Sequence, residues 1–215
     1  MIHVYGTSHV SQQSIERIDE AIDKHDPDIV ALELDPIRLQ ALKSGEENSS
    51  SGGSLFIRLL RKFQNRIGSK TGLMPGQEML YAYHRALGEE RDVVLVDQDI
   101  RVTVQKLKRD VGRKEKVKAG ASLLAGLVLP GGIDVSEIPD EKMVQQMSAE
   151  MKHSFPGLHS VLLQERNIVM AESLKQVQRE NPDSDIVAFV GAAHRKFLED
   201  ELSEFDSQST VEEFF

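Results

Sequence analysis

The stretch Ile29 to Leu34 (IVALEL) is an almost continuous apolar run, and it ends in Asp35-Pro36. Runs of this kind are typical of strands that helices cover on both faces of a parallel sheet. Asp92 to Val96 (DVVLV) and Asp185 to Val190 (DIVAFV) repeat the pattern, and Ile2 to Tyr5 is a shorter β-prone segment. Segments with helical spacing of apolar residues lie between them. The sequence therefore predicts an α/β fold with a mostly parallel central sheet covered by helices.

The 215 residues are predicted to form one domain. Glu46 to Ser54 (EENSSSGGS) has no periodicity, and the patterns on either side of it are too short to fold separately. We therefore expect a single domain of residues 1–200 with a flexible Ser/Gly-rich insertion at 45–54, followed by an acidic C-terminal tail at 201–215. The absence of cysteine excludes a cysteine nucleophile, a thiolate metal site and a disulfide framework.

The chain is acidic, with 35 Asp and Glu residues, 26 Lys and Arg residues and a net charge of -9. This balance argues against nucleic acid as a partner, because phosphate binding relies on a basic surface. The stretch from Arg101 to Lys118 is nevertheless basic, which indicates either a solvated helix face or contact with an anionic membrane. The apolar segment from Ala119 to Gly132 is too short to span a bilayer and is a candidate homodimer interface.

Polar side chains follow each of the four predicted strands: His9, Glu33, Asp35, Asp97, Asp99 and His194. In an open α/β sheet, ligands bind in the crevice outside the carboxyl ends of the strands, so we expect these side chains along one edge. Glu33 lies inside an apolar run, where an unpaired carboxylate is costly to bury. We therefore expect Glu33 to contact a cation, a hydrogen-bond donor or a metal ion.

Two kinds of chemistry fit this set of side chains. Two imidazoles and a carboxylate, from His9, His194 and Glu33, suffice for a divalent-metal site with an open position for water. The sequence lacks His-Glu-x-x-His, so such a site must be assembled from separate loops. Without a metal, His9 or Glu33 could act as general base on water, and Arg38 or Arg101 could stabilise an oxyanion.

Two further motifs have a plain structural interpretation on spacing alone. Glu78 lies near the start of a predicted helix, where a carboxylate is favoured by the helix dipole. Glu165-Arg166 lies within another helix, where an adjacent acid and base usually belong to a solvated face or a structural ion pair.

Six motifs between residues 6 and 194 together resemble the TraB/PrgY family, which is associated with pheromone shutdown. They are Gly6-Thr7-Ser8-His9-Val10-Ser11, Glu33-Leu34-Asp35-x-x-Arg38, Gly76-Gln77-Glu78-Met79, Asp97-Gln98-Asp99-Ile100-Arg101-Val102-Thr103, Glu165-Arg166-Asn167 and Val190-Gly191-Ala192-Ala193-His194. That family is similar to the TIKI proteins, membrane-tethered metalloproteases whose activity is attributed to two Gly-x-x-His motifs and a glutamate, and more remotely to the erythromycin esterase and ChaN-like proteins. Asn167 stands where an acidic residue is more usual.

The resemblance implies that a divalent metal ion (Mn, Co or Zn) is held by His9, Glu33 and His194. It implies a catalytic cleft that also contains Glu78, Arg38, Arg101, Glu165 and Arg166. We therefore expect a metal-dependent hydrolase, a peptidase acting on peptide signals, with a peptide or small molecule as substrate. The alternative is a non-catalytic peptide-binding or signalling regulator that uses the same cleft. The expected location is the cytoplasm, or the soluble domain of a membrane-associated protein.

Overall fold

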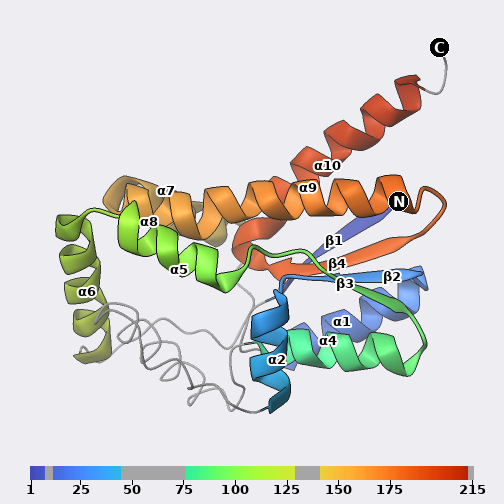
Figure 1. The fold of residues 1–215 in the computed structure, drawn as a ribbon, viewed down its shortest axis with the longest axis horizontal. Helices are drawn as coiled ribbons and strands as arrows, with labels where there is room; N and C mark the ends of the chain where they lie inside the picture. The colour runs from blue at the N-terminus through green and yellow to red at the C-terminus, as the bar shows by residue number, and fades with distance from the viewer. Residues whose placement is uncertain (8–11, 45–75, 129–140, 213–215) are drawn as a thin grey trace.

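The structure, a computed structural model, describes residues 1–7, 12–44, 76–128 and 141–212 (Figure 1). Within these ranges four strands form one sheet in the order β1-β4-β2-β3, and each pair of neighbours is parallel. The predicted α/β fold with a mostly parallel sheet covered by helices is confirmed. The strands are β1 (Ile2–Thr7), β2 (Ile29–Leu32), β3 (Asp92–Leu95) and β4 (Ile186–Gly191).

Helices cover both faces of this sheet (Figure 1). In the described ranges they are α1 (Gln12–His25), α2 (Pro36–Ser44), α4 (Gln77–Gly88), α5 (Ile100–Arg109), α6 (Arg113–Val128), α7 (Glu141–Ser154), α8 (Pro156–His159), α9 (Glu165–Glu180) and α10 (Ala192–Glu212). A π-helical turn (Ser160–Gln164) joins α8 to α9, so one helical segment occupies the long stretch before β4. The predicted insertion at 45–54 and residue His9 lie outside the described residues, and α10 continues through residues 201–212 of the predicted tail.

The apolar residues of β2 alternate between the two faces of the sheet. Val30 and Leu32 pack in the cluster that contains α1 and α4, whereas Ile29 and Ala31 pack in the cluster that contains α9 and α10. All four are buried, which explains why the run has no polar residue every second position. Because successive side chains point to opposite faces, the row of Ile29 and Ala31 leads to Glu33 on the α9 and α10 side.

In the middle of the sheet, neighbouring strands are followed by helices that lie on opposite faces. α1 and α4, which follow β1 and β2, pack on one face, and α10, which follows β4, packs on the other. β4 lies between β1 and β2 in the sheet, so the helix that follows β4 packs on the opposite face from the helices that follow its two neighbours. A crevice at the carboxyl ends of such strands is where ligands bind in open α/β sheets.

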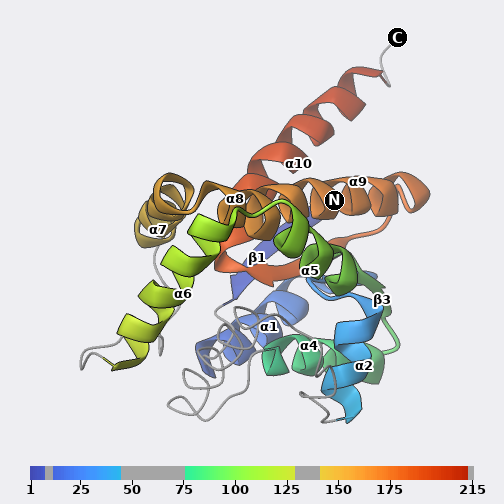
Figure 2. The ribbon, with the colours of Figure 1, turned by 60° about the vertical axis from the view of Figure 1, so that its left-hand side comes forward.

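A smaller apolar cluster connects α5, α6 and α8 beside the sheet, through Leu107, Val111, Ala119, Leu158 and Val161. Figure 2 shows that α6 extends away from the sheet past this cluster. Its first half belongs to the basic stretch predicted from the sequence. Among the helices of the ranges given above, none is long and apolar enough to cross a bilayer.

Candidate functional site

Glu33 lies at the carboxyl end of β2, at the reversal point of the sheet. The strand ends one residue before Glu33, because the chain bends and the Leu34 amide donates to the Leu32 carbonyl at 2.7 Å. The Glu33 side chain is 2% exposed and accepts hydrogen bonds from Arg166 Nη2 and, at 2.5 Å, from the Gly191 amide. The sequence predicted that this carboxylate would contact a cation, a hydrogen-bond donor or a metal ion, and in the structure it contacts a cation and a backbone donor.

Arg166 joins Glu33 to a second buried carboxylate, that of Asp97 after β3. Its Nε and Nη2 atoms donate to the two Asp97 oxygens at 2.9 and 2.8 Å. Arg38 of α2 donates from Nη1 to Asp97 Oδ2 at 2.7 Å. Burial by itself lowers the pKa of Arg166, but the charges of Glu33 and Asp97 and their hydrogen bonds outweigh burial and raise the pKa above its ordinary value. Arg166 therefore stays charged at any physiological pH.

His194 lies in the first turn of α10 and is buried beside Glu33, with 3.5 Å between its Nε2 and Glu33 Oε1. Its Nδ1 lies 2.6 Å from Asn167 Oδ1 on α9. An amide oxygen can only accept, so Nδ1 carries the proton in this pair. In the neutral ring the lone pair is then on Nε2, the atom that faces Glu33. Asn167 thus sets the tautomer of the imidazole, a contact that the sequence did not predict.

A second ion pair lies at the start of α9, next to the first. Lys106 of α5 donates from Nζ to Glu165 Oε2 at 2.5 Å, and Gln98 Oε1 lies 3.4 Å from the same nitrogen. Sequence reasoning missed Lys106. The sequence feature that could have identified Lys106 is helical spacing. Lys106 follows the buried Thr103 by three residues and so lies on the same side of α5.

The other predicted cleft residues, Glu78 and Arg101, have local partners. Glu78 is buried at the start of α4, and its Oε2 accepts from the Gly76 amide at 3.1 Å, as its capping interpretation predicts. The Arg101 side chain is 77% exposed and pairs with both oxygens of Asp99. Arg38 and Arg166 therefore belong to the buried charge cluster, whereas Arg101 lies at its surface.

The cluster supplies part of the ligand set that a metal ion needs. Two ligands about 2.05 Å from a tetrahedral ion lie about 3.4 Å apart, close to the separation of His194 Nε2 and Glu33 Oε1. A hydrogen bond from the other ring nitrogen, here to Asn167, is usual for a ligating histidine. No group of three or more His, Cys, Asp or Glu side chains that could hold a metal occurs in the part of the chain that the structure describes. The third predicted ligand, His9, lies outside that part.

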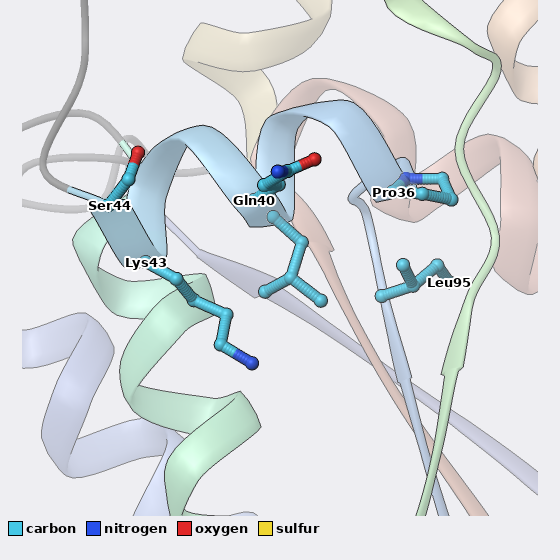
Figure 3. A pocket seen from close by; sticks show the side chains of 6 residues that line it. Pro36, Gln40, Lys43, Ser44 and Leu95 are labelled. Carbon is cyan, nitrogen blue, oxygen red and sulfur yellow. The ribbon is translucent and has the colours of Figure 1, made fainter.

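An open pocket of about 390 Å³ lies between α2 and β3, and it does not coincide with the charge cluster. Figure 3 shows α2 side chains on one side of it and Leu95 of the sheet on the other. Its lining residues are Pro36, Leu39, Gln40, Lys43, Ser44 and Leu95, which supply no carboxylate or imidazole. The candidate site is therefore the cluster around Glu33 rather than this pocket.

Together these features define an open, parallel α/β protein with a buried Glu-Arg-Asp-Arg cluster and a histidine at the reversal point of its sheet. The model of the TraB/PrgY/gumN family matches residues 1–197, and the chain belongs to this family. It is 32% identical over 204 residues to an uncharacterised protein of Methanocaldococcus jannaschii, covering 90% of this chain and 51% of that protein.

TraB domain-containing proteins of Bos taurus and Homo sapiens are also similar to the chain. Each is 27% identical over 201 residues, which covers 83% of this chain and 52% or 53% of the relative. The chain spans about half the length of the curated relatives that it matches. The similarity therefore concerns the domain described here and not the rest of those proteins.

Proposed function

We propose that the protein is a metal-dependent hydrolase that acts on peptides. The observation that carries the proposal is the pair His194 Nε2 and Glu33 Oε1, 3.5 Å apart at the carboxyl end of the sheet, with Asn167 holding the other ring nitrogen. His9, two residues after the end of β1 in the sequence, would complete the ligand set. The metal, when bound, supplies a water molecule of lowered pKa as the nucleophile.

The protein's own groups have distinct tasks in this proposal. Asn167 keeps the Nδ1 proton of His194 in place and so presents Nε2 toward Glu33. Arg38 and Arg166 are positive charges fixed by Asp97, and an arginine held in this way stabilises a developing oxyanion without reorganisation. Glu165 or Glu78 would accept the proton from water and deliver it to the leaving group. Glu165 is the better placed for proton exchange with solvent, because its side chain is 29% exposed whereas Glu78 is buried.

A binding module is the second candidate, and one observation favours it. Arg166 already neutralises Glu33, and a cation so close repels a metal ion. The cluster could then capture a peptide or a small anion without cleaving it. In that case Arg38, whose side chain is 30% exposed, is the group nearest to a ligand.

Metal uptake and product analysis distinguish the two candidates. Purified protein is dialysed against Mn, Co or Zn ions and its metal content is measured; it is then incubated with a peptide library, and new peptide ends are sought by mass spectrometry. We expect metal uptake and cleavage by the wild type, and loss of both in His194→Ala and His9→Ala. His84→Ala, at an exposed position of α4, is the matched control. Unchanged peptides and no metal uptake by the wild type would exclude the hydrolase and favour the binding module.

A further inference from the structure

Asp35, two residues after Glu33, has a buried oxygen whose role the proposed hydrolase does not explain. Its Oδ1 caps α2 by accepting from the amides of Ile37 and Arg38 at 2.9 and 3.2 Å. Its Oδ2 is buried, the residue is 1% exposed, and no residue that the structure describes donates to this oxygen. Buried acceptors almost always have a partner, so an acceptor without one points to a missing donor.

The charges around Asp35 favour a cation as that donor. Glu33 and Asp97 share Arg166 and Arg38, so two carboxylates face two guanidinium groups. Among the described residues Asp35 forms no ion pair, and the groups that balance its charge by direct contact are the two amides at the start of α2.

Arg101 is the nearest candidate cation for Asp35 Oδ2, but it already pairs with another carboxylate. The pKa of Arg101 is raised chiefly by its hydrogen bond with Asp99 and by the Asp99 charge, and to a smaller extent by Asp35, so Arg101 lies within electrostatic range. Its guanidinium nevertheless pairs with both oxygens of Asp99 at the surface. The partner of Asp35 is therefore sought outside the cations of the described ranges.

The geometry of Asp35 selects among cations. A guanidinium group prefers two carboxylate oxygens, and Oδ1 is committed to the helix cap. A calcium ion takes six to eight oxygen ligands and a magnesium ion keeps several bound waters, so both need more room than one buried oxygen offers. A primary ammonium group is compact, carries one charge and can donate a single strong hydrogen bond to one oxygen.

We propose that Asp35 Oδ2 is the acceptor of a subsite for the primary ammonium group of a ligand. The group belongs either to the amino terminus of a peptide or to a lysine side chain, which share this chemistry. The subsite itself is independent of hydrolysis, whereas its assignment to a peptide substrate rests on the proposed function.

The first test compares two probe ions by thermal unfolding, without added metal. The n-butylammonium ion is compared at equal concentration with n-butyltrimethylammonium, which has the same charge and alkyl chain but no N–H donor. A ligand that binds the folded state raises Tm, so we expect a higher Tm with n-butylammonium. Asp35→Asn removes the charge and Oδ2 but keeps an equally good helix cap, and it should abolish the difference.

The control for the charge change is Asp28→Asn, at the opposite end of the sheet, where the carboxylate accepts from the Asp185 amide. This variant should keep the wild-type difference in Tm. Equal Tm values for the wild type with the two ions, or an undiminished difference in Asp35→Asn, would overturn the subsite.

A second test identifies the source of the ammonium group. Binding is measured by calorimetry for an alanine peptide with a free amino terminus, its acetylated form, and an acetylated peptide containing one lysine. Loss of a charged hydrogen bond should weaken binding about tenfold or more, so the acetylated alanine peptide should bind weakest. The stronger of the other two peptides identifies the source. If the three peptides do not differ while n-butylammonium is bound, the peptide assignment is wrong and the subsite stands.

Discussion

Arg166 joins two buried carboxylates that come from different strands of the sheet. Glu33 and Asp97 are each 2% exposed at the side chain, and both pair with the same guanidinium group. Replacing one member of a buried ion pair leaves the other charge buried and unpaired, which is far more costly than the net value of the pair. The cluster therefore depends on Arg166 more than on any single carboxylate.

At the residue scale, Arg166→Met is expected to lower the free energy of unfolding by about 3–5 kcal/mol, because Glu33 and Asp97 lose their shared cation. Arg166→Lys should lower the free energy of unfolding less, since lysine keeps the positive charge although it lacks the planar set of donors of the guanidinium group. Urea unfolding monitored by circular dichroism measures both. Arg109→Met, which removes a surface pair with Asp110, is the control and should change stability little. A stability of Arg166→Met equal to that of the control would show that the cluster is not electrostatically coupled.

Asn167 contacts the ring of His194 with a neutral side chain, at a position where the sequence analysis expected an acidic residue to be more usual. A carboxylate at this position would add a negative charge beside the ring and favour the protonated imidazolium. The neutral amide oxygen accepts from Nδ1 and so orients the His194 ring without adding that charge. The sequence could show that Asn167 departs from the usual residue, but not that it contacts His194, because the two lie on different helices.

At the scale of elements, α4 begins at a backbone conformation that only glycine adopts easily. Gly76 has φ of 92°, and a Cβ added at this position would lie 3.2 Å from the Leu42 side chain of α2. The Gly76 amide donates to Glu78, so this turn also fixes the buried carboxylate. At Gly88, the other end of α4, an added Cβ would have no heavy atom of the described residues within 4 Å.

The two glycines form a matched pair for mutation. Gly76→Ala is expected to destabilise the fold by about 1 kcal/mol or more, because alanine is strained at positive φ. Gly88→Ala should be neutral or stabilise by up to about 0.5 kcal/mol, since it restricts the unfolded chain without a clash. Chemical denaturation of both variants tests the contrast, and equal effects would contradict it.

The elements also show how far sequence reasoning extends. The apolar runs predicted all four strands, and their ends predicted Glu33 and His194 at one edge, because strands that alternate with helices run parallel and end at the same edge of the sheet. The partner of Glu33 could not be predicted. It depends on the register of α9, which the π-helical turn before Glu165 shifts relative to an unbroken helix. On spacing alone Arg166 therefore looked like part of a solvated face or a structural ion pair, whereas the family resemblance placed it in the cleft with Glu33.

At the scale of the whole molecule, three histidines far from the cluster are held with lowered pKa. Burial and then the charge of His25 lower the pKa of His3, and burial and then Lys24 lower that of His25; the two rings stack at 3.8 Å. Burial and then Lys152 lower the pKa of His159. In each case folding favours the neutral ring.

Stability should therefore fall as the solution becomes acidic. Below about pH 6.5 the unfolded chain binds protons at these histidines more readily than the folded chain does, so stability rises with pH in this window and is complete above it. Urea unfolding at a series of pH values measures the slope. The double variant His3→Gln/His25→Gln should show a smaller loss on acidification, and a slope identical to that of the wild type would contradict the assignment.

The pairing of β1 with β4 links the first and last strands of the sheet, with Ile2 opposite Ile186. Contacts of such long sequence separation close slowly in folding, because a large loop must be ordered before they form. During synthesis on the ribosome, β1 and β2 cannot pair with β4, the strand that lies between them, until β4 has been made. Until then Glu33 lacks both the Gly191 amide and His194, so a nascent chain completes the charge cluster around Glu33 only after β4 and the start of α10 have been made.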